Sequence, residues 1–314
     1  MSRGASRRVE RVLTRLKLKQ LRLLVAVARH GSILHAAREM NLSQPAATKM
    51  IKDLETDFEV QLFTRTNRGV LPTVFGDSLI RHGKLVFAQI AHAAQELDDL
   101  AQGTAGRVVV GTLLAASARV LPMAIDAMLR ERPDLVVKVV EGTNEVLMPA
   151  LRSGELDLVV GRLPTHRHRD DVEQRTLYQE RIVAVVRAGH PLDGRTDLTL
   201  DDLAELSWIL PPAETTLRRQ LDQLFATRPE SSPRRVVDSV SYLTNRALLL
   251  RSELVSVMPS HVAAADLDSG AFARLDWTVP VGTGPVGVSY RRRGALSPAA
   301  DAFIRTLGEI GATL

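Results

Sequence analysis

The chain contains no cysteine among its 314 residues. This absence excludes a thiol nucleophile, thiolate metal ligands and structural disulfides, because each of these requires a cysteine sulfur. A chain without disulfides suits a reducing compartment such as the cytoplasm.

The sequence also lacks a run of about 18 apolar residues, the length that a membrane-spanning helix needs. Its arginine-rich N-terminus has no apolar core of about 7 to 15 residues, which a secretory signal would contain. We therefore expect a protein that is neither exported nor inserted in a membrane and that works in the cytoplasm.

Catalytic and metal-binding motifs are absent as well. The eight histidines are scattered, and only His166 and His168 lie close together, in the polar run THRHRDD. That run is typical of an exposed loop, which is favoured over a metal site. No phosphate-cradling glycine loop and no nucleophile elbow is present. We expect no enzymatic activity, no metal and no cofactor.

The most informative segment of the chain runs from Ser32 to Glu55, where two short helices joined by a tight turn are predicted. Ser32 is placed to cap the first helix, and Ser43, followed by Gln44-Pro45, to cap the second. A third helix is predicted before them, up to Gly31. Apolar residues at helical spacing give each helix one buried face: Leu21, Leu24, Val25, Ala28, then Ile33, Ala36, Ala37, Met40, then Ala47, Ile51, Leu54 and Phe58.

The free face of the helix after Ser43 carries small polar and basic groups near its N-terminus. A helix-turn-helix places such groups against base edges in the major groove. Gln44 can pair with adenine through two hydrogen bonds, Ala46 and the Thr48 methyl can touch thymine methyls, and lysines can reach phosphates. The predicted DNA contacts on this helix are Ser43, Gln44, Pro45, Ala46, Thr48, Lys49 and Lys52.

Two short extended segments follow within FTRTNRGVLPT, from Phe63 to Thr73. They predict a hairpin wing around Asn67 to Gly69, with Arg65 and Arg68 at its tip to grip phosphate or the minor groove. The alternative is an ordinary helical bundle whose lysines are solvated.

The distribution of charge favours DNA binding. Residues 1–73 contain 14 Lys and Arg against 6 Asp and Glu, a net charge of +8, whereas the whole chain is +5 and its other 241 residues are −3. A basic end on a slightly acidic chain is expected of a phosphate-binding module. The first residues extend this basic end, and a solvated tail is favoured over an arm in the minor groove; they include Arg3, Arg7, Arg8, Arg11 and Arg15.

The run AAREMNLSQPAATKMIKDLE, followed by LFTRTNRGVLPTVFG, resembles the winged helix-turn-helix of LysR-type bacterial transcriptional regulators, and the similarity continues through the whole chain. Within that family, the chain is most similar to the sugar-responsive galactose-binding-protein regulators and the protocatechuate-pathway regulators. The resemblance implies an α/β fold class: an N-terminal winged helix-turn-helix, a long linker helix and a two-lobed effector domain of periplasmic-binding-protein type. It also implies base or backbone contacts by Gln44, Pro45, Ala46, Thr48 and Lys49, with Arg65 and Arg68 in the wing.

A long helix is predicted from about Val74 to Gln102, a stretch without proline. Its apolar residues are separated by alternating steps of four and three: Leu79, Gly83, Val86, Ile90, Ala93, Leu97 and Leu100. A period of about 3.5 residues predicts a coiled-coil seam, so the helix is expected to form a homodimer that reads a palindromic promoter site in double-stranded DNA. The alternative is a helix packed on its own domain.

After a small-residue break at 102–106, strands and helices alternate, which predicts parallel sheets. The expected strands are 107–111, 135–141, 156–161 and 181–186, and the expected helices are 117–131, 145–153, 200–206 and 216–225. A final strand, 286–290, and helix, 298–314, are expected by resemblance to return to the first unit. The expected domains are a basic extension (1–17), a DNA-binding domain (18–74), a linker helix (75–102) and an effector domain (107–314), with lobe one at 107–177 and 282–314 and lobe two at 178–281.

A ligand is expected between the two lobes, at the carboxyl ends of their strands. Helix N-termini and a guanidinium favour an anionic or hydroxyl-rich ligand. Matching the family's pattern, with Asn144 opening a helix beside them, assigns the effector contacts Ala115, Ala116, Ser117, Thr143, Asn144 and Arg162 on lobe one and Pro211, Thr215 and Thr216 on lobe two. Some family members carry serine where this chain has Ala115 or Ala116, so Ser117 or Thr143 would have to supply the donor. Alternatively, Thr143 and Thr215 are helix caps and Arg162 is paired across the lobe.

These features together predict a sequence-specific transcriptional regulator whose activity is modulated by a sugar, a sugar acid or an aromatic acid. The resemblance implies a homotetramer and makes RNA polymerase a candidate partner. One alternative is a constitutive DNA-binding regulator without an effector. Another is a cytoplasmic solute-binding protein or enzyme whose helical end serves only assembly.

Overall fold

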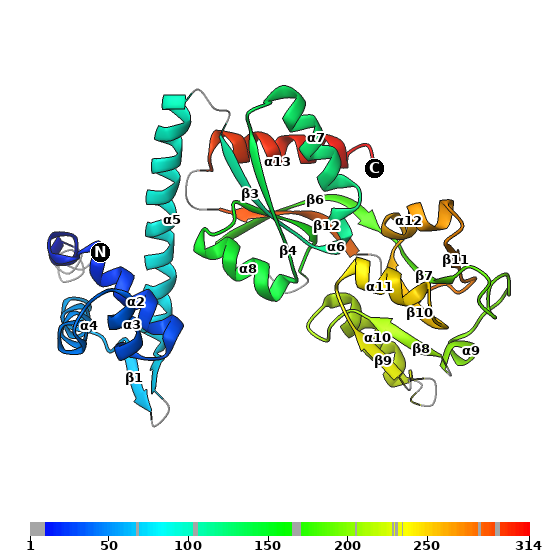
Figure 1. Cartoon of the computed structure of the whole chain (residues 1–314), viewed down its shortest axis with the longest axis horizontal. Coiled ribbons are helices and arrows are strands. Elements are labelled where there is room, and N and C mark those ends of the chain that lie inside the picture. Colours follow the sequence, from blue (N-terminus) through cyan, green and yellow to red (C-terminus); the bar gives the residue numbers. More distant parts are fainter. Residues whose placement is uncertain are drawn as a thin grey trace. The chain divides into compact units, whose positions relative to one another are not determined.

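A computed structural model describes residues 10–66, 69–102, 106–164, 171–204, 206–227, 229, 232–233, 235–281, 284–292 and 296–314. The chain divides into two compact units, residues 1–94 and 95–314 (Figure 1). No helix within the described ranges is long and apolar enough to cross a membrane.

The first unit is built on three helices, α2 (Leu18–His30), α3 (Ile33–Glu39) and α4 (Gln44–Phe58). The predicted caps are present, because the hydroxyls of Ser32 and Ser43 accept hydrogen bonds from the backbone N–H groups of His35 and Ala46, each at 3.4 Å. The helices share one apolar core that contains Leu24, Ala36, Ala47 and Leu54. The predicted helix-turn-helix is therefore confirmed.

The predicted wing is also confirmed. Strands β1 (Phe63–Thr66) and β2 (Gly69–Pro72) pair in antiparallel register, with Arg65 opposite Val70. The N–H of Val70 donates to the carbonyl oxygen of Gly31 at 2.8 Å, which ties the wing to the end of α2. Gly69 has a φ of +129°, and a Cβ there would lie 2.4 Å from the Gly31 oxygen, so this close approach requires glycine.

The long helix α5 (Val74–Gln102) follows the wing. The first part of its seam packs on its own domain: Leu79 contacts the three-helix core, and a Cβ at Gly83 would lie 3.6 Å from Val25. Three later apolar residues of the seam are exposed, with 38% of Val86, 46% of Ile90 and 68% of Leu97 accessible. The expectation of one continuous intermolecular seam was wrong for the first part, where contacts within the domain bury the apolar positions.

The second half of the N-terminal extension, from residue 10, is not the solvated tail that was expected. Residues 10–15 are helical, and Arg11 Nη2 donates to the backbone oxygen of Asp57 and to Oε1 of Glu59, both at 2.8 Å. Arg3, Arg7 and Arg8 lie outside the described residues. An ion-paired arginine therefore holds the extension against the end of α4.

The first lobe of the second unit is a five-stranded sheet of order β4-β3-β5-β12-β6 (Figure 1). Its strands are β3 (Arg107–Thr112), β4 (Val136–Glu141), β5 (Leu158–Arg162), β6 (Val172–Glu180) and β12 (Gly284–Arg291). Its helices are α6 (Leu114–Ser117), α7 (Val120–Glu131), α8 (Asn144–Ser153) and α13 (Pro298–Gly311). The predicted return of the last strand and helix is confirmed, since β12 pairs with β5 and β6.

The second lobe is a sheet of order β11-β7-β10-β8-β9. Its strands are β7 (Ile182–Arg187), β8 (Ser207–Leu210), β9 (Arg235–Asp238), β10 (Leu254–Pro259) and β11 (Phe272–Arg274), and its helices are α9 (Leu200–Ala204), α10 (Thr216–Thr227), α11 (Tyr242–Leu249) and α12 (Ser260–Asp268). Trp208 anchors its core, with edge-on ring contacts to Phe225 and Trp277 at centroid distances of 5.6 and 5.9 Å.

Two expectations for these lobes need correction. Both sheets are mixed rather than parallel, because the β12 pairings and the pairs β7–β10 and β7–β11 are antiparallel. The helix expected at 117–131 is two helices, α6 and α7, separated at Ala118 and Arg119. A short turn replaces the first part of the expected helix, since Arg119 adopts a non-helical ψ of −73° with φ of −136°.

Candidate functional sites

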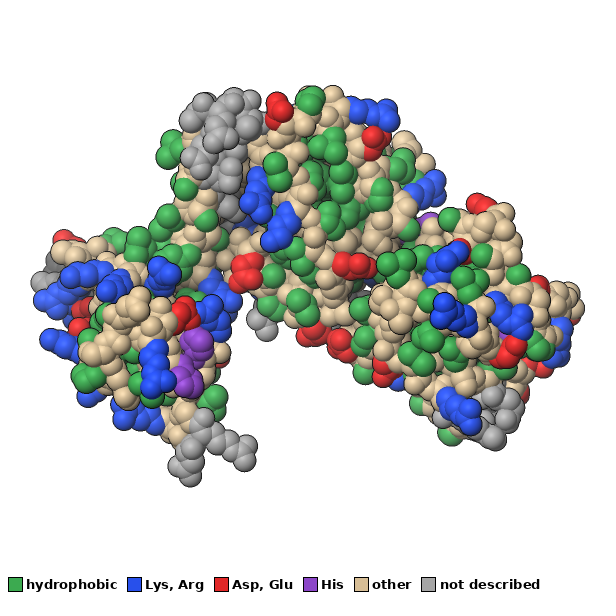
Figure 2. Space-filling view, viewed as in Figure 1, with side chains coloured by type: hydrophobic (Ala, Val, Ile, Leu, Met, Phe, Trp, Pro, Cys, Tyr) green, Lys and Arg blue, Asp and Glu red, His purple; other side chains and the backbone are tan. Residues whose placement is uncertain are grey.

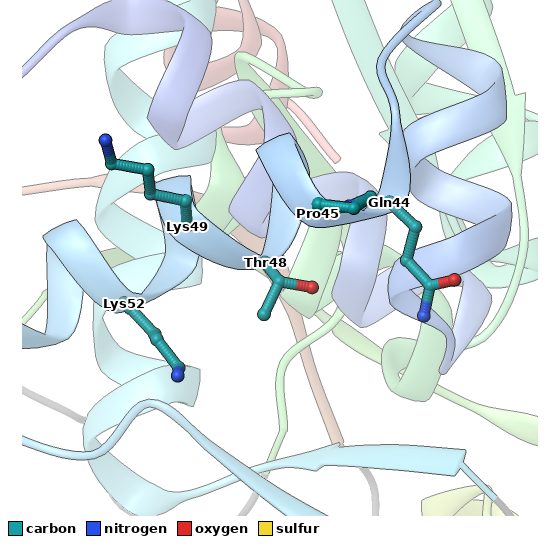
Figure 3. A pocket seen from close by; sticks show the side chains of 5 residues that line it. All are labelled: Gln44, Pro45, Thr48, Lys49 and Lys52. Atoms are coloured by element: carbon teal, nitrogen blue, oxygen red, sulfur yellow. The ribbon is translucent and has the colours of Figure 1, made fainter.

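The exposed surface of α4 forms a shallow groove lined by Gln44, Pro45, Thr48, Lys49 and Lys52 (Figure 3). Gln44, Thr48 and Lys52 follow one another at intervals of four residues and project to the same side of the helix, whereas Lys49 projects to another side. An amide, a hydroxyl with its methyl group, and two ammonium groups are thus presented to solvent. This set can hydrogen-bond base edges and neutralise phosphates.

The other predicted residues of α4 have local structural roles. The Ser43 hydroxyl caps the helix, and Ala46 is half-buried beside the fully buried Ala47. Pro45 occupies the first turn, where its missing N–H costs no helical hydrogen bond. Together they fix the start of α4 and so determine where Gln44 is presented.

Arg65 adds a positive charge on the wing, where it is exposed on β1. Arg68, the other predicted wing contact, lies outside the described residues. Lys and Arg side chains gather on the visible face of the first unit (Figure 2). The first unit therefore combines a polar groove with basic surroundings, as nucleic-acid binding requires.

Two of the predicted effector residues of the first lobe, Thr143 and Asn144, lie at the start of α8. Thr143 has extended backbone geometry at the N-cap position, but its side chain makes no capping hydrogen bond. Asn144 Nδ2 donates to the carbonyl oxygen of Arg162 at 3.2 Å, which joins two of the predicted residues. Thr143 is thus the N-cap residue of α8, as the alternative interpretation held, but its hydroxyl makes no capping hydrogen bond with the helix.

The predicted effector residues on α6 have fewer exposed polar groups for a ligand than those at the start of α8. Ala115 and Ala116 are buried, with 6% and 0% of their surfaces accessible. The Ser117 hydroxyl donates to the carbonyl oxygen of Leu114 at 3.0 Å within the same turn. Of the two donors proposed to replace a serine here, Thr143 is the one without an internal hydrogen bond to its own helix.

The predicted residues of the second lobe make their hydrogen bonds locally. Thr215 Oγ1 donates to Pro212 O at 2.8 Å and accepts the N–H of Arg218, so Thr215 caps α10 as the alternative held. Thr216 Oγ1 accepts from Arg219 Nη2 at 3.3 Å. The Pro211 carbonyl accepts from Arg218 Nη1 at 3.1 Å. All of these hydrogen bonds lie within the second lobe, so they do not connect Pro211, Thr215 or Thr216 to the predicted effector residues of the first lobe.

Arg162 is paired across its own sheet. Its Nε lies 3.6 Å from Oε2 of Glu180, and both side chains are buried. Burial raises the pKa of Glu180 to about 7, and the positive charge of Arg162 partly opposes this shift. A Cβ at Gly284 would lie 2.2 Å from Arg162 Nε, so a larger residue there would displace the guanidinium.

Two functional candidates were missed by sequence reasoning, Tyr178 on β6 and His261 on α12. The Tyr178 hydroxyl donates to the carbonyl oxygen of Ala115 at 2.7 Å, and His261 Nε2 lies 2.6 Å from the same oxygen. Burial, with a smaller contribution from the positive charge of Arg119, outweighs this hydrogen bond and lowers the pKa of His261, which favours the neutral ring. Both lobes thus converge on one carbonyl of the predicted effector segment.

No group of three or more metal-ligating side chains occurs in the part of the chain that the structure describes. His166 and His168, which the sequence placed in an exposed loop, lie outside that part.

Comparisons with known proteins agree with this arrangement. Residues 18–77 match the family described as bacterial regulatory helix-turn-helix protein, lysR family, and residues 101–311 match the LysR substrate binding domain. The chain is 33% identical over 295 residues to the HTH-type transcriptional regulator GbpR of Azospirillum brasilense, covering 93% of this chain and 86% of the relative. It is 34% identical over 278 residues to the HTH-type transcriptional regulator PcaQ of Agrobacterium fabrum, covering 88% and 89%.

A solved structure of CbnR, a LysR family transcriptional regulator, superposes with a TM-score of 0.63 at 22% identity, covering 95% of this chain and 99% of CbnR. The two family matches and the relatives named as transcriptional regulators identify a DNA-binding transcriptional regulator with an effector-binding domain. The chain belongs to the LysR family of bacterial regulators.

Proposed function

We propose that this regulator reads a palindromic promoter site with Gln44, Thr48 and neighbouring residues of α4, and that a sugar, a sugar acid or an aromatic acid modulates that binding. The observation that carries the DNA-binding part is the row of Gln44, Thr48 and Lys52 along one side of α4. Arg65 and Arg68 complete the proposed contact through the wing.

The proposed effector lies between the two lobes in the bacterial cytoplasm. The α8 N-terminus offers backbone N–H groups, the Thr143 hydroxyl is not used as a cap, and Arg162 supplies a positive charge nearby. These groups suit a carboxylate with hydroxyl substituents. The effector biases regulation only by binding one conformation of the lobes more tightly than another.

The proposed assembly is a homodimer through α5 and, by family likeness, a homotetramer, with RNA polymerase as a candidate partner. Two copies of α4 on a two-fold axis would read two half-sites, as other helix-turn-helix dimers do. The exposed apolar side chains of Val86, Ile90 and Leu97 support the dimer.

A constitutive regulator without an effector is the second candidate. It is favoured by the internal hydrogen bonds of Ser117, Thr215 and Thr216 and by the burial of Ala115 and Ala116, which leave few groups free for a ligand.

Thermal unfolding of the full chain against a panel of sugars, sugar acids and aromatic acids separates the two candidates. A ligand at a hundredfold excess over its dissociation constant should stabilise the fold by about 2.7 kcal/mol. Thr143→Val should abolish that stabilisation without changing the unfolding of the ligand-free protein. Stabilisation by no member of the panel would support the constitutive candidate.

A further inference from the structure

The short helix α6 belongs to the first lobe, but one of its side chains packs on the second. Ala115 and Ala116 are part of the apolar core of lobe one. Leu114 instead packs against a buried cluster of lobe two that includes Val183 and Val262. The backbone of α6 also lies against α12 of lobe two. Helix α6 is therefore held by both lobes.

A second link between the lobes is made at the carbonyl oxygen of Ala115. The hydroxyl of Tyr178, which like Ala115 belongs to lobe one, donates to this oxygen at 2.7 Å. His261, on α12 of lobe two, places Nε2 at 2.6 Å from the same oxygen, and its ring stands edge-on to that of Tyr178 with the centroids 5.7 Å apart. Since a carbonyl only accepts, His261 donates through Nε2, and the oxygen takes one hydrogen bond from each lobe.

Both links lie beside a point where the chain passes from one lobe to the other. Strand β6 ends at Glu180 and β7 begins at Ile182. The N–H of Ser260, the first residue of α12, donates to the carbonyl oxygen of Arg181 between them at 2.8 Å, and His261 is the next residue. A change of lobe arrangement that moves α12 relative to α6 therefore has to break the His261 contact and withdraw Leu114 from lobe two.

The two donors to the Ala115 oxygen differ in what such a movement does to them. Tyr178 stays with Ala115, because both residues belong to lobe one, so the carbonyl keeps a donor after His261 has left. A buried acceptor without any donor would carry the full cost of its desolvation. The tyrosine removes this cost, which makes the histidine link releasable.

We propose that α6 is a releasable clamp: Leu114 and His261 hold the two lobes of the ligand-free effector domain in one arrangement, and release of the clamp is the step through which an effector acts. This inference rests on the proposed function, because it assigns the regulation of the proposed effector site. Leu114 and His261 are positioning residues, which act by fixing the helix that carries the predicted effector contacts 115–117. An effector that binds the released arrangement more tightly shifts the population toward it.

The distance between the lobes can be measured directly in the full chain. The chain contains no cysteine, so spin labels can be placed at chosen sites. Glu131→Cys on α7 labels lobe one and Gln223→Cys on α10 labels lobe two, both at exposed positions. The labelled chain is diluted with an excess of unlabelled chain, so that pulsed electron-electron double resonance measures distances within one chain. We expect one narrow distance distribution, and a broad one would overturn the proposal.

Two matched pairs of variants then test the clamp. His261→Phe and Tyr178→Phe each remove one donor to the Ala115 oxygen, but only His261→Phe should broaden or shift the distribution, because only that donor comes from the other lobe. Leu114→Ala should also broaden it, whereas Leu248→Ala, which removes a leucine packed on the same cluster from within lobe two, should not. Equal effects within a pair would overturn the clamp. Each pair decides independently, so a variant that does not fold leaves the other pair to give the result.

The link to regulation is tested by fluorescence anisotropy with a DNA duplex selected by the wild-type chain. His261→Phe should change the affinity for this duplex by roughly 5- to 150-fold, the range typical of coupling between distant sites, and Tyr178→Phe should leave it unchanged. An unchanged affinity for His261→Phe would overturn release as the regulatory step. None of these measurements uses a ligand, so failure of the ligand panel to stabilise the protein counts against the proposed effector, whereas failure here counts against the clamp.

Discussion

The guanidinium Nε of Arg162 lies 3.6 Å from Oε2 of Glu180, and the two side chains are 9% and 2% exposed. Glu180 is the last residue of β6, and β7 of the other lobe begins two residues later, at Ile182. The pair therefore sits where the chain passes from one lobe to the other. The protonation state of Glu180 is coupled to the same arginine that the proposed effector would contact.

This pair predicts a pH dependence of stability. The pKa of Glu180 is about 7 in the folded protein against an ordinary value of 4.5. Below pH 4.5 the carboxyl is protonated in both states, and between 4.5 and about 7 only the unfolded state releases the proton. The contribution of Glu180 to the free energy of unfolding should therefore fall with rising pH across this window, by roughly 3 kcal/mol, and stay constant above it.

Glu180→Gln should remove this fall, because the amide does not titrate and keeps the shape of the protonated carboxyl. The measurement is urea unfolding of the full chain at about pH 5 and about pH 8, with Glu155→Gln as the control at an exposed position. An equal loss of stability in wild type and Glu180→Gln would disprove the assignment.

The carbonyl of Ala115 predicts an energetic coupling between Tyr178 and His261. Either Tyr178→Phe or His261→Phe alone should cost about 1 kcal/mol, since the other donor still satisfies the oxygen. The double variant leaves the carbonyl without these donors and should cost more than the two single changes together. A double-mutant cycle measures the difference, and strictly additive costs would show that the two contacts are independent.

The exposed half of the α5 seam predicts the dimer. Ile90→Glu with Leu97→Glu should shift the protein toward monomer, because a charge at an apolar seam must be desolvated on association. Analytical ultracentrifugation reports the change in mass. Leu250→Glu, at an exposed leucine on the second unit, serves as the control and should leave the mass unchanged. Full retention of the oligomer by the seam variant would exclude this part of α5 from the interface.

The sequence predicted those parts of the molecule whose signals are local. Helix starts are indicated by Ser32, Ser43 and Pro45, because helix capping depends only on the nearest three or four residues. The wing was predicted for the same reason, since its two paired strands are close neighbours in the sequence.

The parts that the sequence did not predict depend on distant residues. Strand β6 was missed because it lacks the alternation of apolar and polar residues that indicates a strand. Its polar residues Glu173, Gln174 and Arg175 follow one another, and only its two end residues are fully buried. Tyr178 and His261 meet a carbonyl that is 63 and 146 residues away in the chain. The burial of Leu79 and Gly83 by the first unit's own helices likewise depends on tertiary packing, which a heptad pattern does not report.

The central claim is that α4 reads DNA sequence through Gln44, and one measurement tests it most directly. Duplexes selected from a random pool by the full-length protein are titrated against wild type, Gln44→Ala and Lys49→Ala. We predict that Gln44→Ala costs about 1 to 3 kcal/mol at a single base position. Lys49→Ala should instead weaken all sequences alike and reduce the salt dependence. If wild type and Gln44→Ala select the same sequences with the same affinity, α4 does not read bases through this residue and the account is wrong.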